Sequence, residues 1–222
     1  MTVVLDTRRA QMVRAFRWSA IFFSGFLLIT HQVLINGPLI EIDKWIHDLE
    51  RPEFRGVSGF IIRRLDDLGL RGVTATALLL AAFYIARRFK TWRPLNLAIL
   101  TVISLNIVFG FFKFWLGRTK PKVGIDLLHF GGMSYPSGHA SNALLTWGVL
   151  AYLIYRYAHV DRYRGRLASA GVAAISLTVC TVSLIRDTHW FSDLLGGLFI
   201  GAALLVLIIA IDRYWPSNSQ LS

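Results

Sequence analysis

Cysteine is almost absent from this sequence: Cys180 is the single one among 222 residues. A disulfide framework is therefore excluded, and Cys180, inside a long apolar run, is expected to be a packing residue. Acidic side chains are also few, 13 against 24 Lys and Arg. Without a cysteine pair or a His-Glu-x-x-His motif, the chain offers no complete set of metal ligands. We therefore expect neither a metal site nor another cofactor.

Apolar residues dominate the chain instead. They make up 55% of it, and the mean hydropathy is +0.52, which is rare for a soluble domain. Several runs with few charges approach the roughly 20 residues of a membrane-spanning helix. We therefore expect an all-α integral membrane protein, in which residues 1–222 form a single domain with six transmembrane helices in one bundle. The six runs are 16–35, 72–86, 95–115, 140–157, 167–185 and 194–211.

The net charge of +11 is distributed in a way that indicates a membrane topology, not a nucleic-acid partner. Three basic clusters fall on the same side of the six-span arrangement. This positive-inside pattern predicts a multi-pass protein with both termini in the cytoplasm and a lipid bilayer as its partner. The compact six-span form looks bacterial, so we expect the inner membrane; the oligomeric state is left open. The clusters are Arg8, Arg9, Arg14 and Arg17; Arg87, Arg88, Lys90 and Arg93; and Arg156, Arg162, Arg164 and Arg166.

The outer segment 38–71 connects the first two spans. Its apolar residues recur at helical spacing, which predicts an amphipathic helix lying on the outer membrane interface. No chemistry is assigned to this segment. The recurring residues are Leu39, Ile42, Trp45, Ile46 and Leu49.

A motif on the outer face, Pro136-Ser137-Gly138-His139, begins one of the apolar runs. The free N–H groups and positive dipole end of a helix start bind anions. Ser137 suits the N-cap, Gly138 lets an anion approach the backbone, and His139 lies at the rim. The alternative is an ordinary capped helix with a chance histidine.

A second motif, His189 to Asp193, begins the last run on the same face. The two residues are four apart and therefore share one side of a helix. A carboxylate bonded to one ring nitrogen fixes the tautomer and leaves the other nitrogen free as a nucleophile. A His–Asp pair that only packs is the alternative, but ionisable residues at membrane depth favour chemistry.

A basic segment, residues 113–122, precedes the first motif on the same outer face. Lys113 falls at the edge of an apolar helix, where a charge is costly without an anionic partner such as phosphate. Snorkelling into lipid headgroups is the alternative. We expect the active-site segments to be 113–139 and 183–193, with Asp126 and His129 in a solvated loop. The cations of the basic segment are Lys113, Arg118, Lys120 and Lys122.

These residues resemble the motifs of the membrane-bound type 2 phosphatidic acid phosphatases, or lipid phosphate phosphatases, of bacterial type. That family shows Lys, six residues, Arg-Pro; then Pro-Ser-Gly-His; then Ser-Arg, five residues, His, three residues, Asp. The resemblance implies that His189 attacks phosphorus and carries a phosphohistidine while Asp193 orients it. It also implies that His139 protonates the leaving alkoxide and then activates water. The phosphate oxygens would be held by Lys113, Lys120, Ser137 and the Gly138 N–H.

The chain departs from the family pattern at two arginines. Lys120 stands in place of one, and Ser183 stands in place of the other. Lysine does not replace the bidentate fork of arginine. We expect Arg118 and Arg186, which lie close in sequence to these positions, to restore phosphate binding. A weakened or altered enzyme is the alternative.

The resemblance implies a metal-independent phosphatase that removes a terminal phosphate from a membrane lipid at the periplasmic face. Isoprenoid diphosphate, phosphatidylglycerol phosphate, phosphatidic acid and a lipid A phosphate are all candidate substrates. A lipid phosphotransferase using the same phosphohistidine is one alternative. A non-catalytic lipid-binding or transport relative is another, against which the intact His139, His189 and Asp193 argue.

Overall fold

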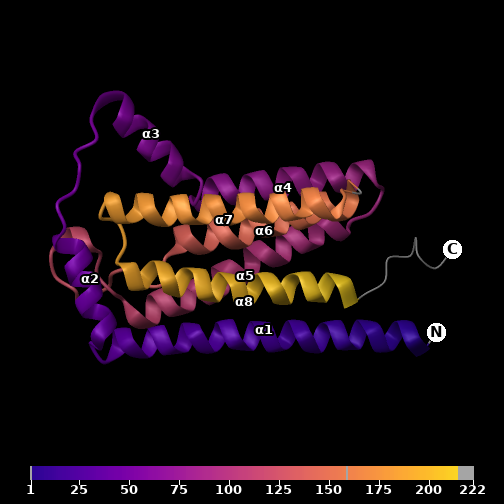
Figure 1. Ribbon diagram of the computed structural model, residues 1–222, viewed down its shortest axis with the longest axis horizontal. Helices are drawn as coiled ribbons and strands as arrows, with labels where there is room; N and C mark the ends of the chain where they lie inside the picture. Colours follow the sequence, from indigo (N-terminus) through magenta and orange to yellow (C-terminus); the bar gives the residue numbers. More distant parts are fainter. Residues whose placement is uncertain (1, 159, 215–222) are drawn as a thin grey trace.

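The computed structural model describes residues 2–158 and 160–214, so residue 1, residue 159 and the end of the predicted domain lie outside the described residues. Within this part of the chain the regular structure is helical, with no strand. The expected all-α class is confirmed, and Figure 1 shows the long helices side by side in one bundle. The elements are α1 Thr2–Leu34, α2 Pro38–Asp48, α3 Gly56–Asp67, α4 Arg71–Arg88, α5 Arg93–Leu116, the short 3-10 helix η1 Pro121–Val123, α6 Gly138–Tyr157, α7 Arg162–Ile185 and α8 Phe191–Tyr214.

Each of the six predicted apolar runs lies in one of the long helices, except that Ile35 follows the end of α1. Four of them, α1, α5, α7 and α8, are long and apolar enough to cross a membrane. A fifth span results if α3 and α4, which are bent by 55° at their junction, are counted together. Helix α6 is not among these candidate spans; it carries Ser141, Asn142 and Thr146, all of them buried inside the bundle. The protein is thus a helical membrane protein, and the count of six spans stays a prediction.

Helix α6 lies at the centre of the bundle, in contact with α4, α5, α7 and α8. Its contact with α8 is close because glycines face it. A Cβ built on Gly197 would lie 2.4 Å from the carbonyl oxygen of Ser137, and one on Gly201 would lie 3.3 Å from the Cα of Ser141. Small residues that let two backbones approach are typical of helix packing in membranes. The result is that the start of α8 lies directly against the start of α6.

Helix α2 lies across the end of the bundle opposite both ends of the described chain, and α3 lies beside α7 at the same end (Figure 1). Helix α2 falls within the predicted amphipathic segment and exposes Ile42 and Trp45. It packs on α1 and α8, with Ile40 and Asp43 buried. A helix here is confirmed, while its place at a membrane interface stays a prediction. Helix α3 was not predicted as a separate element.

Candidate active site

The two histidine motifs meet where α6 and α8 begin. The ring centroids of His139 and His189 are 5.8 Å apart. The backbone N–H of Ser137 donates to the carbonyl oxygen of Asp193 at 2.9 Å, which joins the two helix starts directly. Ser137 also caps α6, since its hydroxyl accepts the N–H of Ala140 at 3.3 Å. The structure therefore brings residues about 50 positions apart in the sequence into one site.

Asp193 is fully buried, and four donors surround its carboxylate. The Nδ1 of His189 lies 3.4 Å from Oδ2, and the backbone N–H of Trp190 donates to the same oxygen at 3.1 Å. The hydroxyl of Ser134 also donates to Oδ2, and Nη1 of Arg118 donates to Oδ1 at 2.7 Å. With Nδ1 of His189 directed at the carboxylate, Nε2 is the ring nitrogen left to face a substrate. This is the arrangement that a histidine nucleophile needs.

Arg118 is fully buried, which differs from the sequence prediction. Its guanidinium forms ion pairs with Asp43 at 2.7 Å, Asp126 at 2.6 Å and Asp193 at 2.7 Å. Together with a bond to the Ser192 hydroxyl, these contacts occupy all five N–H donors of an arginine. No N–H of the Arg118 guanidinium is thus left for a phosphate in this arrangement, and its role in phosphate binding stays a prediction. Arg118 is connected to His189 through Asp193, which contacts both side chains.

Two of the carboxylates around Arg118 lie outside the motifs: Asp43 in the segment 38–71, to which no chemistry was assigned, and Asp126 in the loop after α5. Asp43 of α2 accepts the backbone N–H of Ser192 at 2.8 Å and binds its hydroxyl as well. Burial raises the pKa of the Asp43 carboxyl, and the charge of Arg118 opposes that rise. Asp126, expected in a solvated loop, instead accepts two hydrogen bonds from Arg118, whereas His129 of the same loop is exposed. The solvated-loop prediction was thus wrong for Asp126.

Two lysines lie beside the start of α6. The side chain of Lys113 passes next to Gly138, where an added Cβ would be 3.9 Å from the lysine Cε. The ammonium group of Lys113 donates to the carbonyl oxygen of Met133. Lys120 is exposed, and both lysines are close enough to His139 for their charges to act on it. The site therefore combines two cations with the positive end of a helix dipole, an arrangement that attracts anions.

Arg186, which ends α7, contacts a carboxylate of α3. Its Nη1 donates to Asp66, and the hydroxyl of Ser183 donates to the other oxygen of Asp66 at 3.3 Å. The charge of Asp66 also acts on His139. The α3–α4 break explains this proximity: a Cβ on Gly69 would lie 2.8 Å from the carbonyl oxygen of His139. Arg186 and Ser183 therefore share one partner at the rim of the site.

Comparison with known proteins places this arrangement in a family. The model of the PAP2 superfamily matches residues 94–216, more than half of the chain. The chain belongs to the PAP2 superfamily. Phosphatidylglycerophosphatase B of Bacillus subtilis (strain 168) is 30% identical over 126 residues, which are 56% of this chain and 60% of that relative. The match therefore spans less than two thirds of the relative's length.

A solved structure of the PAP2 superfamily shares the fold. It is the crystal structure of a transmembrane PAP2 type phosphatidylglycerolphosphate phosphatase from Bacillus subtilis. The TM-score is 0.76 at 20% sequence identity, and the similarity covers 87% of this chain and 95% of the other. The resemblance seen in the motifs is thus confirmed at the level of the family and of the fold.

Sequence reasoning missed several residues that contact the PAP2 motifs. Ser134 donates a hydrogen bond to Asp193. Asp43 accepts one from Arg118, and Asp66 accepts one from Arg186. A signal existed only for Asp43, as a carboxylate among apolar residues at helical spacing. In the described ranges, no three His, Cys, Asp or Glu side chains are grouped so that they could hold a metal ion.

Proposed function

We propose that this protein is a lipid phosphate phosphatase that removes a terminal phosphate from a membrane lipid through a phosphohistidine. One observation carries the proposal: His189, held at Nδ1 by Asp193, faces His139 across 5.8 Å at a helix start. Membership of the PAP2 superfamily supports it. The names of the two Bacillus subtilis relatives make phosphatidylglycerol phosphate the first substrate to test.

In the first chemical step, Nε2 of His189 attacks phosphorus. A P–N bond forms while the P–O bond to the lipid breaks, and the electron pair leaves with the lipid oxygen. His139 gives its proton to that oxygen, so that the lipid departs as an alcohol. Asp193 stabilises the positive charge that develops on the His189 ring.

In the second step, His139 takes a proton from water, and the resulting hydroxide attacks the phosphohistidine. The P–N bond breaks, inorganic phosphate leaves and His189 regains its starting form. During both steps Lys113, Lys120 and the N–H of Gly138 bind the negatively charged phosphate oxygens. Such fixed donors are the largest source of rate enhancement in many enzymes.

Phosphate binding further involves Arg186 in this proposal. Only its Nη1 contacts Asp66, and within the described part of the chain its Nε and Nη2 form no hydrogen bond or ion pair. The side chain is 29% exposed, so the remaining donors face an accessible rim. Since the lysines and Arg186 supply positive charge, we propose that the reaction needs no metal ion.

The orientation of the site is also part of the proposal. Both ends of the described chain lie at the end of the bundle opposite α2 (Figure 1). The basic clusters in the first half of α1, around the α4–α5 junction and around the α6–α7 junction belong to this same end. The positive-inside rule then puts the termini in the cytoplasm and the histidines at the periplasmic face of the inner membrane.

The test is release of inorganic phosphate by the purified protein in detergent with excess chelator. The substrates would be phosphatidylglycerol phosphate, phosphatidic acid, an isoprenoid diphosphate and a lipid A phosphate. His189→Ala is the inactive variant, and His129→Ala, which changes an exposed histidine of the nearby loop, is the matched control. Release by the parent and His129→Ala but not by His189→Ala is expected. Equal release by His189→Ala, or none from any lipid by the parent, would overturn the proposal.

A further inference from the structure

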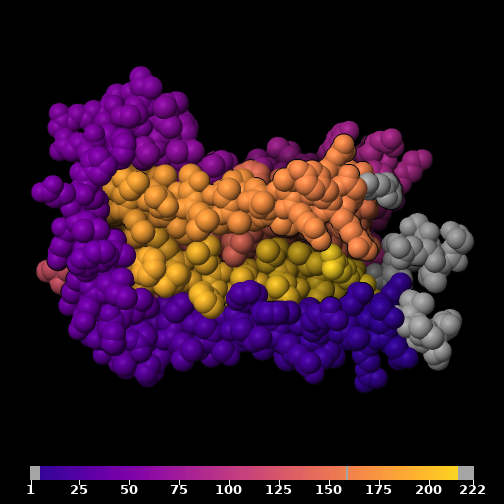
Figure 2. All heavy atoms as spheres, in the orientation of Figure 1, coloured from indigo at the N-terminus to yellow at the C-terminus, as the bar shows by residue number. Residues whose placement is uncertain are grey.

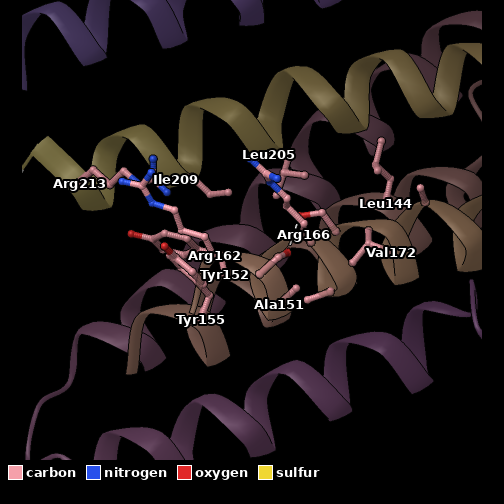
Figure 3. Close-up of a pocket in the computed structure, with 15 residues that line it drawn as sticks. Leu144, Ala151, Tyr152, Tyr155, Arg162, Arg166, Val172, Leu205, Ile209 and Arg213 are labelled. Carbon is pink, nitrogen blue, oxygen red and sulfur yellow. Dashed lines mark hydrogen bonds between the residues drawn. The ribbon is translucent and has the colours of Figure 1, made fainter. Parts of the chain in front are cut away.

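A cavity of about 620 Å³ lies between α6, α7 and α8, away from the histidine site. Figure 2 shows α7 and α8 separated by a furrow, with part of α6 visible at its floor. We call this cavity the lateral groove; Figure 3 shows the side chains that line it. Its walls are Leu144 to Tyr155 on α6, Arg162 to Ala173 on α7 and Leu205 to Arg213 on α8.

The lateral groove has the dimensions of one membrane leaflet. Along α6 it extends from Leu144 to Tyr155, a rise of about 16 Å at roughly 1.5 Å per residue. Half of a hydrocarbon core of about 30 Å is nearly the same length. The groove is open because small residues such as Gly148, Ala151 and Ala173 line it. Acyl chains of a single leaflet would therefore fit along it.

Arginines line one end of the lateral groove. Arg162, Arg166 and Arg213 are exposed there, and in the described ranges none of them forms an ion pair with a carboxylate. The nearby Asp161 and Asp212 are paired with other arginines. Cations that have no carboxylate partner, at the mouth of an apolar groove, complement an anionic group attached to an apolar chain.

The positive region continues beyond the groove. Arg213 also lines a cavity of about 280 Å³ between α1 and α8, together with Arg8. It lines a third cavity of about 400 Å³ together with Arg156. Three cavities thus meet at one arginine, at the end of the bundle opposite α2. A headgroup with more than one oxygen anion would have several cations within reach.

We propose that the lateral groove binds a phospholipid with an anionic headgroup, in the leaflet opposite the histidine site. The phosphate would lie between Arg162, Arg166 and Arg213, and the acyl chains along α6. This lipid is not the substrate. Tyr155 is 16 residues from His139 along the same helix, which is about 24 Å at roughly 1.5 Å per residue. The site does not depend on the proposed phosphatase activity.

A second copy of the chain could bind in the apolar groove instead of a lipid. In a two-fold dimer the same patch faces itself. The arginines at the mouth of one groove would then approach those of the other copy, and like charges at an interface are unfavourable. The charge pattern therefore favours the lipid.

The first test measures lipid binding by native mass spectrometry of the purified protein. Phosphatidylglycerol is the anionic probe and phosphatidylcholine the zwitterionic comparison. The double variant Arg162→Gln/Arg166→Gln should bind phosphatidylglycerol about tenfold or more weakly. The matched control is Arg87→Gln/Arg88→Gln, two exposed arginines at the same end of the bundle that do not line the groove. Equal binding by both double variants would overturn the proposal.

The second test fills the groove. Ala173→Trp places a large ring in the lateral groove, whereas Ala174→Trp places it on an exposed position next to the groove. Only Ala173→Trp should lose phosphatidylglycerol binding, and both variants should keep phosphate release at the distant histidine site. If Ala173→Trp does not fold, the arginine variants decide alone. A change from dimer to monomer in Ala173→Trp, with phosphatidylglycerol binding retained, would assign the groove to a second copy instead.

Discussion

Arg118 and Asp193 form an ion pair in which Nη1 and Oδ1 are 2.7 Å apart and neither side chain has exposed surface. Asp193 binds His189 through its other oxygen, so the position of the histidine depends on Arg118. Asp43 and Asp126 form ion pairs with the same guanidinium. One buried arginine therefore ties α2 and the loop after α5 to the first turn of α8.

Replacing Arg118 with Gln should destabilise the protein and abolish phosphate release. Removing one partner of a buried ion pair typically costs about 3–5 kcal/mol, because the remaining charge stays buried. Thermal unfolding in detergent would measure the loss of stability. Lys122→Gln, an exposed cation of the same segment, should change neither property. A folded Arg118→Gln enzyme with a raised KM and an unchanged kcat would show that Arg118 binds phosphate after all.

Asp43→Asn tests whether α2 contributes to catalysis through Arg118. The amide keeps the size of the side chain but removes one of the negative charges that surround the Arg118 guanidinium. We expect kcat to fall about tenfold or more with little change in KM, because small displacements of reacting groups slow chemistry. Glu41→Gln, an exposed carboxylate on the same helix, is the control. Equal kinetics in the two variants would remove Asp43 from the positioning network.

His139→Asn should separate the two chemical steps. With a lipid alcohol as leaving group, phosphate release should fall by about 10²–10⁴-fold, because the general acid is lost. With p-nitrophenyl phosphate the leaving group needs no proton, so phosphorylation of His189 should continue while hydrolysis stalls. A labelled, acid-labile phosphoprotein should then accumulate in His139→Asn and be absent from His139→Asn/His189→Ala. Labelling that persists in the double variant would exclude His189 as the nucleophile.

Arg186→Ala tests whether Arg186 takes over the role of the family arginine, at whose position this chain has Ser183. If its free donors stabilise the phosphoryl group, phosphate release should fall by about 100-fold or more. Arg64→Ala is the comparison, since Arg64 pairs with Asp67 on the exposed side of α3. Normal turnover by Arg186→Ala would restrict this arginine to a structural contact with Asp66.

The long helices and the motif residues could be predicted because their signals are local. An apolar run sets α4 at Arg71–Arg88, close to the predicted 72–86, and the spacing of His189 and Asp193 puts them on one side of a helix. The bend before α4 could not be predicted. A glycine is required at position 69 because the backbone there lies against His139, which belongs to another helix. A local pattern does not report such a contact.

The partners of the motif residues could not be predicted for the same reason. Asp43 and Ser192 are 149 residues apart, and Arg118 and Asp193 are 75 apart. Lys113 and Arg118 look alike in the sequence as cations before a histidine motif. Only the fold distinguishes a lysine beside Gly138 from an arginine enclosed by three carboxylates.

Gly197→Ala tests the contact that holds the two motifs together. Its Cβ would lie 2.4 Å from the carbonyl oxygen of Ser137, a backbone atom that can move only if α6 and α8 separate. We expect lower thermal stability and a loss of phosphate release, because Ser137 N–H and Asp193 would lose their contact. Gly110→Ala is the matched control: this glycine also lies inside a helix, and an added Cβ meets nothing within 4 Å. Since alanine favours a helix by up to about 1 kcal/mol over glycine, Gly110→Ala should be as stable as the parent or more so. Equal behaviour of the two variants would mean that the site tolerates movement between α6 and α8.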